Sequence, residues 1–443
     1  MVREEVELVP SGLVTCLINE EEVRILKISP ETLTLRLAEE LNDKTFLKVA
    51  FYSFKEYKYN EVIIDDFQIE NKIEEEFYFK YMIKVKDKHY AENVRRIVKD
   101  YYNYIMLKNY GAENEFSKEM VKYPAKLDYD FYKYFSNQKK EWLLNFDWKE
   151  NVLENVEVAI KIDNHVLYNK YLELEFIRFK NYYLSENYMD NTIICNKEIS
   201  RIYIGNEFCH NLFPKADMLM DILTKAKQEG LKVTLCFTYI RENYIENTKK
   251  VLEDVYEFCI LNNLKIELVI NDWGILDLLQ GKEDVFDLSL GVLLNKRKKD
   301  PRYIYKKGYN ENKELMAKNN LNNEVFSGYL AKYNIHRFEY ESCGYKLEIA
   351  NGKHSLQLPF YQTNTSQYCT LYAMCKNQDR GKQKLVKCCP KYCTDYVFAY
   401  PKHLNMVGRY NSLFAFDSSI IKDSKLVLEY INSGIDRLVL NFL

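Results

Sequence analysis

Short apolar stretches separated by polar turns occupy the first part of the chain and give way to a helical pattern. From residue 87 to 108, Val94, Ile97, Val98, Tyr101 and Ile105 recur near the spacing of one helix face. The stretches before them have the length and apolar pattern of β-strands, at 22–29, 32–38, 45–54, 60–69 and 76–85. We therefore predict a small, mostly-β barrel closed by a helix over residues 1–108.

The next segment, residues 109–154, has no clean hydrophobic period. It is polar, aromatic and charged, and it carries Trp142 and Trp148. Such a pattern is typical of a linker with short helices. We expect the two tryptophans to pack on a neighbouring domain.

From residue 155 to 443 the pattern changes to short apolar strands that alternate with amphipathic helices. Helical patterns cover 215–230, where Gly230 is a stop signal, and 248–263. The expected strands are 156–162, 201–205, 232–237, 265–270, 288–294, 336–341, 355–360 and 437–442. About eight strand–helix repeats predict an α/β fold, a TIM-like (β/α)8 barrel that follows the small β domain.

Composition and charge limit the classes of partner. The 443 residues carry a net charge of −2, so any contact with RNA needs a local basic patch, such as KRKKDPR at 296–302. No apolar run approaches the ~20 residues of a membrane span. The chain opens MVREEVELVP, without the pattern of an export signal. We therefore expect a cytoplasmic protein whose cysteines stay reduced.

The cysteines form the most unusual feature of the sequence. Five of the eleven lie between Cys369 and Cys393. Cys375, Cys389 and Cys393 are spaced C-x13-C-x3-C, and Cys369 and Cys388 are near neighbours. Thiolates at such spacing suit an iron–sulfur cluster or zinc. The fourth ligand is Cys369 or, from the end of the second barrel strand, Cys209.

Two further interpretations of this spacing stay open. A structural zinc site uses the same thiolates, although the paired CxxC units of zinc ribbons are missing. Buried, inert thiols are the third interpretation, because free cysteine is among the most buried residue types. Thiolates bind both iron and zinc, so the residue types alone do not separate the two metals.

A family resemblance favours iron. The stretch IYIGNEFC at 202–209 and the later CCPKYC resemble the collagenase-like peptidase family (unassigned-peptidase family thirty-two) and its oxygen-independent hydroxylase relatives. The resemblance covers roughly residues 155–443. It implies a [4Fe–4S] cluster held by Cys209, Cys375, Cys389 and Cys393. The loop here is one residue longer than in the relatives, and the CCP sequence leaves Cys388 and Cys389 as alternatives.

The N-terminal outline resembles a PilZ domain, the barrel that binds cyclic-di-GMP. That family uses an RxxxR run and a [DN]xSxxG turn. Here no arginine stands four residues after Arg24, and KISPETL at 27–33 keeps Ser29 but has no glycine. Bidentate phosphate recognition therefore lacks its guanidinium groups. We expect no cyclic dinucleotide and a docking role toward a protein partner.

Catalytic side chains in such barrels follow the C-terminal ends of the strands. The candidates are His210, beside Cys209, as an acid/base or supporting group; Asp272, after the fourth strand; and Arg409, as a substrate contact. No G-x-S-x-G elbow or HExxH motif is present, so a serine or zinc hydrolase mechanism has no residues to carry it.

These observations predict an iron–sulfur barrel protein that hydroxylates, or otherwise modifies by redox chemistry, an RNA base or a small aromatic ring without oxygen. The first alternative is a non-catalytic signalling or docking protein with a structural metal site. The second alternative is a peptidase, as the family's name suggests.

Overall fold

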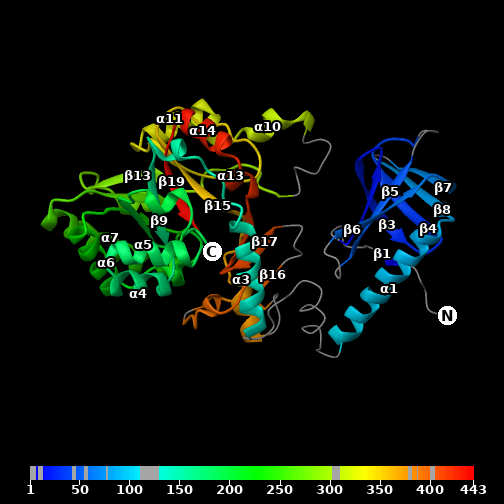
Figure 1. Ribbon diagram of the computed structural model, residues 1–443, viewed down its shortest axis with the longest axis horizontal. Coiled ribbons are helices and arrows are strands. Elements are labelled where there is room, and N and C mark those ends of the chain that lie inside the picture. The colour runs from blue at the N-terminus through cyan, green and yellow to red at the C-terminus, as the bar shows by residue number, and fades with distance from the viewer. Residues whose placement is uncertain are drawn as a thin grey trace. The chain divides into compact units, whose positions relative to one another are not determined.

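The computed structural model describes residues 6–7, 13–41, 46–53, 58–75, 78–109, 129–301, 310–377, 382–386, 388–399 and 405–443 (Figure 1). The chain divides into two compact units. The first comprises residues 1–125, 305–311 and 400–404, and the second comprises residues 126–304, 312–399 and 405–443.

The first unit is an antiparallel sheet with the strand order β6-β5-β2-β3-β4-β8-β7, in which β1 also pairs with β3. Its strands are β1 (Val6–Glu7), β2 (Val14–Ile18), β3 (Glu21–Ile28), β4 (Thr32–Leu37), β5 (Leu47–Ser53), β6 (Lys58–Ile64), β7 (Phe67–Glu75) and β8 (Tyr78–Val85). The mostly-β character is confirmed. Among the described residues, β6 and β7 end the strand order and do not pair with each other, so the pairings show a sheet rather than a closed barrel.

Two local predictions in this unit were wrong. The stretch 60–69 is not one strand, because Asp65 and Asp66 separate β6 from β7. Aspartate is depleted in β-strands. Strand β2 was missed, and it joins β3 through Asn19 and Glu20, which both have positive φ. Two successive residues in the left-handed backbone conformation form a two-residue turn whose twist matches that of the strands in a β-hairpin.

Helix α1 (Lys88–Asn109) closes the core of this sheet. Tyr90, Val94, Ile97 and Val98 are buried in one cluster with the strand residues. The helix face predicted from the sequence is confirmed for Val94, Ile97 and Val98. The side chains of Tyr101 and Ile105 lie outside the described part of the structure.

The second unit contains a closed barrel of eight parallel strands, which confirms the predicted barrel. The order is β14-β13-β12-β11-β10-β9-β19-β15, and β15 returns to β14. The strands are β9 (Glu157–Ile162), β10 (Arg201–Ile204), β11 (Lys232–Cys236), β12 (Ile266–Ile270), β13 (Phe286–Leu290), β14 (Arg337–Glu341), β15 (His354–Thr365) and β19 (Ile435–Asn441).

Helices occupy most of the connections between these strands. They are α4 (His165–Glu173), α5 (Phe176–Ser185), α6 (Ala216–Gln228), α7 (Ile245–Asn262), α8 (Gly274–Leu278), α10 (Lys313–Ala317), α11 (Glu324–Ala331), α13 (Ser418–Lys422) and α14 (Ser424–Asn432). Helices α4, α6 and α7 lie together outside the strands (Figure 1). The connection from β14 to β15, residues 342–353, is fully described and contains no helix. The strand–helix alternation is therefore irregular at this point.

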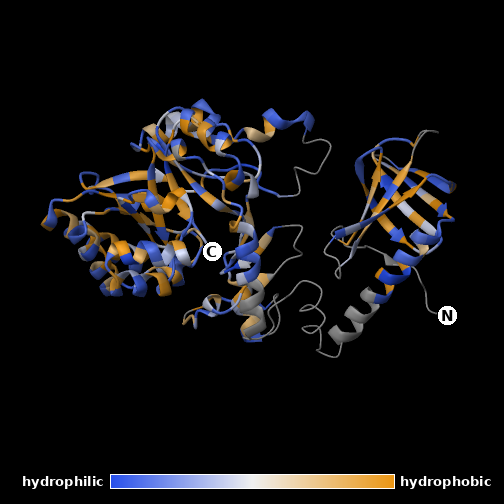
Figure 2. Cartoon of the chain, in the orientation of Figure 1, coloured by the Kyte–Doolittle hydropathy of each residue, from blue (hydrophilic) through white to orange (hydrophobic). Residues whose placement is uncertain are grey.

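The barrel interior combines an apolar layer with charged side chains. Ala159, Tyr203, Cys236, Val269 and Val439, from five strands, form one buried cluster. Below this layer Arg437 donates hydrogen bonds to Glu157 (2.6 Å) and Glu267 (2.6 Å). The strands are mostly apolar and the outer helices are mixed (Figure 2). Because successive side chains of a strand alternate between its two faces, one residue in two enters the interior.

Strand β15 continues beyond the barrel and carries the cysteine stretch. Its second half pairs with β18 (Ser412–Phe416), which pairs with β17 (Met406–Arg409) and then β16 (Phe398–Ala399), all antiparallel. Helix α12 (Thr370–Asn377) and the 3-10 turn η7 (Tyr392–Thr394) lie between β15 and β16. This extension places the cysteine stretch at the C-terminal end of the barrel, which we call the mouth.

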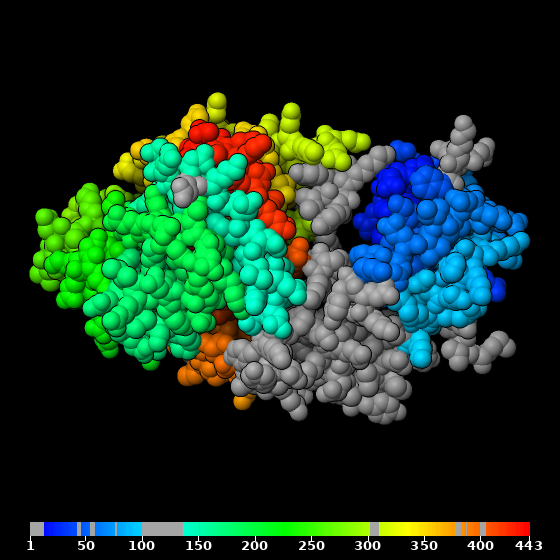
Figure 3. All heavy atoms as spheres, viewed as in Figure 1, coloured from blue at the N-terminus to red at the C-terminus, as the bar shows by residue number. Residues whose placement is uncertain are grey.

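The segment before the barrel belongs to the second unit and packs on its C-terminal part. Helix α3 (Tyr129–Leu143) carries Trp142 in its last turn, and the Trp142 ring stacks on Phe416 at 5.2 Å. Trp148 donates its ring N–H to the carbonyl of Ile420 (2.8 Å). In the space-filling view the cyan segment lies against the red C-terminal segment (Figure 3). Residues 110–128 of the predicted linker lie outside the described part of the chain.

Among the described residues, no helix has both the length and the apolar composition that a membrane span requires.

Candidate functional site

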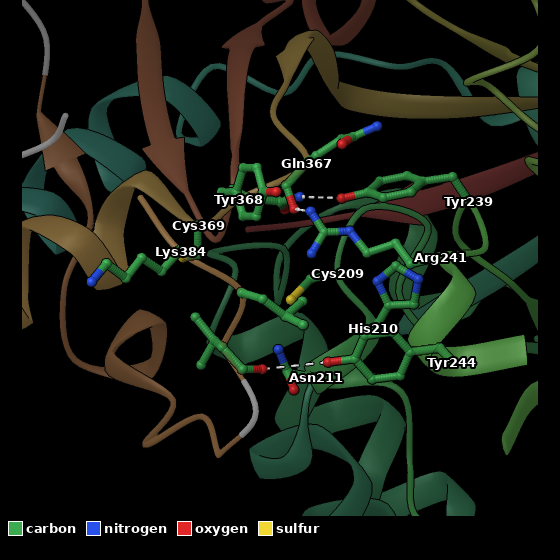
Figure 4. A pocket seen from close by; sticks show the side chains of 13 residues that line it. Cys209, His210, Asn211, Tyr239, Arg241, Tyr244, Gln367, Tyr368, Cys369 and Lys384 are labelled. Carbon is green, nitrogen blue, oxygen red and sulfur yellow. Dashed lines mark hydrogen bonds between the residues drawn. The ribbon is translucent and has the colours of Figure 1, made fainter. Parts of the chain in front are cut away.

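A small cavity of about 30 Å³ opens at the mouth of the barrel (Figure 4). Its lining comes from segments that follow β10, β11 and β15 and from the β17–β18 turn. The lining residues are Cys209, His210, Asn211, Tyr239, Arg241, Tyr244, Gln367, Tyr368, Cys369, Lys384, Leu385, Val386 and Asn411. Residues far apart in sequence therefore meet where barrel chemistry is expected.

The turn after β10 positions Cys209. Gly205 has a φ of +111°, and an added Cβ there would lie 2.5 Å from the carbonyl oxygen of Cys236. Asn206 then accepts the backbone N–H groups of Phe208 and Cys209 on Oδ1, both at 2.9 Å. Glycine permits the close approach, and the asparagine side chain fixes the turn that follows.

Cys369 enters the same cavity from the end of β15. Its Sγ accepts the backbone N–H of Tyr372 (3.3 Å) and donates to the carbonyl of Tyr410 (3.1 Å). The first of these bonds belongs to the opening turn of α12. Cys369 is thus tied to both helix α12 and the β17–β18 turn.

Cys389 and Cys393 approach from the CCPKYC turn. Cys389 Sγ accepts the N–H of Lys391 (3.4 Å), which adopts a positive φ of 60°. Cys393 is buried in η7, and its carbonyl accepts a hydrogen bond from Nε of Arg409 (3.4 Å). We call Cys209, Cys369, Cys389 and Cys393 the thiol cluster.

The four thiols influence one another's ionisation. Burial raises the pKa of Cys209 well above its usual value, and the neighbouring Cys369, Cys393 and Cys389 add to the effect. Burial also raises the pKa of Cys369 to about 11 and that of Cys393 to about 12. Without a cation the thiols are therefore protonated. A bound metal ion reverses this preference, because it stabilises thiolates.

Cys375, which the resemblance implies as a ligand, interacts electrostatically with only one member of this set. Burial raises its pKa to about 12, with smaller contributions from Cys369 and Asp395 and none from the other cluster thiols. Cys388 is exposed. Among the described residues, no three His, Cys, Asp or Glu side chains are already arranged around one metal position. The thiol cluster is chemically suited to a soft metal but is not preassembled.

The three predicted catalytic candidates have different surroundings. His210 lines the cavity and stacks on Tyr244 at 4.5 Å, and burial lowers its pKa to about 4. Asp272 accepts the backbone N–H groups of Ile240 (3.0 Å) and Gly274 (2.8 Å) and holds two loops together. Arg409 lies beside Cys393, where burial raises the pKa of the thiol and the charge of Arg409 offsets part of this rise.

Asn411 joins the segments that line the cavity. Its Nδ2 donates to the carbonyls of Phe208 (2.7 Å) and Ser366 (2.6 Å), and it also lies 3.1 Å from the Tyr239 hydroxyl oxygen. Asn411 is 5% exposed. A single amide thus connects the segments that present Cys209 and Cys369.

Sequence reasoning missed a buried ion pair just below the mouth. Lys161 donates to the carboxylate of Glu207 and to Oε1 of Gln357 (3.1 Å). The available signal was a lysine at an interior position of the apolar strand VEVAIKI. Sequence reasoning also missed Tyr244, which stacks on His210.

Comparisons with known proteins add little to this description. No protein-family model matches the chain, and no curated protein matches it. A solved structure, the uncharacterized Legionella protein Lpg0364, is similar at 9% identity with a TM-score of 0.18. The aligned region covers 23% of this chain and 97% of the Legionella chain. A score of this size carries no argument about fold or function.

Proposed function

We propose that the second unit is a TIM-like (β/α)8 protein that holds a [4Fe–4S] cluster at its mouth, similar to the collagenase-like peptidase family. We further propose that it modifies a small aromatic ring or an RNA base by redox chemistry without oxygen. One observation carries the metal proposal. Two thiols of the cluster each accept a backbone N–H from two or three residues further along the chain, namely Cys369 from Tyr372 and Cys389 from Lys391.

Such N–H···S contacts favour a charged sulfur. A backbone N–H donates to a thiolate more strongly than to a neutral thiol. Hydrogen bonds to ligand sulfurs also help to set the reduction potential of iron–sulfur clusters. Inert core thiols need no such donors, so this pattern supports metal binding over simple packing.

The geometry favours Cys369 over Cys375 as the fourth ligand. Cys369 and Cys209 line the same cavity, and each of the other cluster thiols acts on the pKa of Cys209. Cys375 is linked to Cys369 alone among the cysteines. Since four ligands must converge on one cluster, we propose the thiol cluster as the ligand set.

When bound, a [4Fe–4S] cluster supplies one-electron redox chemistry. The chain itself provides the walls of the site. Tyr239 donates its hydroxyl to the carbonyl of Ser366 (3.2 Å), and Arg241 lies 4.7 Å from the centroid of the Tyr368 ring. These contacts hold the β11 and β15 segments together over Cys209 and restrict the access of water.

The test of the metal proposal is anaerobic purification followed by iron, sulfide and zinc analysis. We expect near-equal iron and acid-labile sulfide and a brown colour that bleaches with dithionite. Serine at Cys209, Cys369, Cys389 or Cys393 should remove the metal. Cys388→Ser is the matched control and should keep it. Loss of metal in Cys375→Ser with retention in Cys369→Ser would restore the ligand set that the resemblance implies.

The alternatives give different results in the same experiment. A colourless protein that carries zinc indicates a structural metal site, because zinc has no redox chemistry. The chain would then be a signalling or docking protein. Cleavage of a peptide substrate that survives removal of the metal would support the peptidase alternative.

For the first unit we propose a docking surface for a protein partner on β7 and β8. Ile69, Ile73 and Met82 expose 45%, 42% and 37% of their surface. Exposed apolar groups of this kind favour protein contacts. If the variant with glutamate at Ile69 and Ile73 retains every partner of the wild type in a cross-linking comparison, this surface has no such role.

A further inference from the structure

Arg409 is a positively charged side chain that the β17–β18 hairpin brings to the thiol cluster. It ends β17, and its Nε donates a hydrogen bond to the carbonyl of Cys393 (3.4 Å). Arg409 is half-buried, so water and salt weaken the field of its charge less than they would at an exposed site. A fixed positive charge therefore lies beside one of the proposed metal ligands.

The hairpin that carries Arg409 is held by several contacts. Tyr410 follows with a positive φ of 58°, and its hydroxyl donates to the Asp163 carboxylate (2.8 Å). The carbonyl of Tyr410 accepts a hydrogen bond from Sγ of Cys369 (3.1 Å). Asn411, the next residue, joins the segments that line the cavity. The position of the guanidinium group thus depends on a turn that is tied to the thiol cluster itself.

Other cations lie around the thiol cluster. Burial raises the pKa of Cys389, and the backbone N–H and the charge of Lys391 offset part of this rise. Arg241 and Lys384 line the cavity beside the thiols, and none of the described residues in that lining is acidic. An acidic group, Asp163, acts in the opposite direction: it adds to the rise that burial causes in the pKa of a cluster thiol. The surroundings therefore favour negative charge on the sulfur atoms.

A metal-loaded thiol cluster carries a net negative charge. Four thiolates exceed the charge of a divalent ion, and they also exceed the charge of the oxidised core of a [4Fe–4S] cluster. Reduction of an iron–sulfur cluster adds one more negative charge. Because opposite charges attract, a fixed cation nearby stabilises the loaded state over the empty one and the reduced state over the oxidised one.

We propose that Arg409 is a positioning residue that acts through Cys393, and that its charge stabilises the metal-loaded thiol cluster and raises the reduction potential of a [4Fe–4S] cluster held there. The part that concerns the reduction potential rests on the proposed function. The part that concerns metal affinity holds for any soft divalent ion. Asp163, with its negative charge, acts in the opposite direction on both quantities.

Redox titration of the anaerobically purified full chain tests the reduction potential. Arg409→Gln should lower the equilibrium constant for reduction about tenfold, which corresponds to about 59 mV for one electron. Arg409→Lys keeps the charge and should retain most of the wild-type potential. Asp163→Asn should raise the potential. Lys346→Gln is the matched control, because it removes a positive charge from a side chain that is 70% exposed and paired with Glu429. It should leave the potential unchanged.

A cobalt titration gives a second readout that needs no iron. Co²⁺ is added to the metal-free chain, and the absorption of cobalt–thiolate bonds measures its binding. Arg409→Gln should bind Co²⁺ about tenfold more weakly than the wild type, and Arg409→Lys and Lys346→Gln should bind it as the wild type does. Thermal unfolding of every variant shows that the fold is kept. A purely structural role of Arg409 would not give shifts of opposite sign in Arg409→Gln and Asp163→Asn.

The outcomes separate this proposal from the proposed function. If the iron–sulfur cluster forms and Arg409→Gln has the wild-type potential, the role of Arg409 is refuted and the proposed function stands. Shifts of the same sign in Arg409→Gln and Asp163→Asn also overturn the role of Arg409. If no iron–sulfur cluster forms but Co²⁺ binding falls in Arg409→Gln alone, the proposed function is refuted and Arg409 keeps its role in metal binding. A chain that binds neither metal refutes both.

Discussion

Lys161 and Glu207 form an ion pair inside the barrel, and their side chains are 2% and 0% exposed. Burial by itself lowers the pKa of Lys161, but the Glu207 carboxylate outweighs it and raises the pKa above its usual value. Oε1 of Gln357 also accepts a hydrogen bond from Lys161 (3.1 Å), and its amide donates to Glu207 (3.1 Å). The pair lies directly below the segment that presents Cys209.

Glu207→Gln should destabilise the chain by about 3–5 kcal/mol, because it leaves a buried lysine without its counter-charge. Urea unfolding of the second unit measures the change. The double variant Lys161→Met, Glu207→Leu should recover most of the loss. The exposed pair Lys346–Glu429 is the control, where Glu429→Gln should change the free energy by less than about 1 kcal/mol. Similar effects at the two pairs would contradict the role of burial.

His354 makes stability depend on pH. Its Nδ1 accepts the backbone N–H of Phe338 (3.2 Å), and its Nε2 contacts the carbonyl of Ala350 (3.1 Å). Protonation of His354 at Nδ1 would place its new N–H against the backbone N–H of Phe338, so two donors would face each other. Burial, the main cause, lowers the pKa of His354 from 6.5 to about 4.

The unfolded chain therefore binds a proton between pH 6.5 and 4 that the native chain does not, and stability falls as the pH falls through this window. The loss should reach about 3 kcal/mol at pH 4. Denaturation curves at several pH values measure it. His354→Gln should remove this part of the slope, and the exposed His336→Gln should leave it. An equal slope in wild type and His354→Gln would exclude His354 as the cause.

Gly205→Ala should destabilise the chain by about 3 kcal/mol for two reasons. The new Cβ would clash with the carbonyl oxygen of Cys236, and alanine is strained at the positive φ of this position. Gly230 is the matched control, with a φ of +70° and no atom within 4 Å of an added Cβ. Gly230→Ala should cost only about 1 kcal/mol from the backbone. Thermal unfolding compares the two, and equal losses would show that the contact with Cys236 is unimportant.

Cys388 should react first with a thiol reagent. It is exposed, whereas the other ten cysteines, all within the described residues, are buried or partly buried. Timed alkylation followed by mass spectrometry should show one fast thiol, lost in Cys388→Ser and kept in Cys389→Ser. We expect the remaining thiols to react about tenfold more slowly. A fast phase that disappears in Cys389→Ser would reverse the assignment of the two cysteines.

Local sequence patterns were sufficient to predict most elements of the fold. The parallel barrel strands and the helix face of Val94, Ile97 and Val98 follow from side-chain periodicity, which each segment carries by itself. The break at Asp65 and Asp66 was missed because these two residues alone interrupt an otherwise continuous strand pattern. Spacing within the cysteine stretch also identified a candidate site without any structure.

The sequence by itself determined the parallel strands, the small β domain and the clustering of cysteines, because these depend on residues close together in the chain. Only the tertiary structure decided that Cys209 lies in one cavity with Cys369, that Glu207 pairs with Lys161 and that Arg409 contacts Cys393. These contacts join residues of different strands and loops. They depend on how the barrel closes and on the paths of its loops, and no local pattern encodes either.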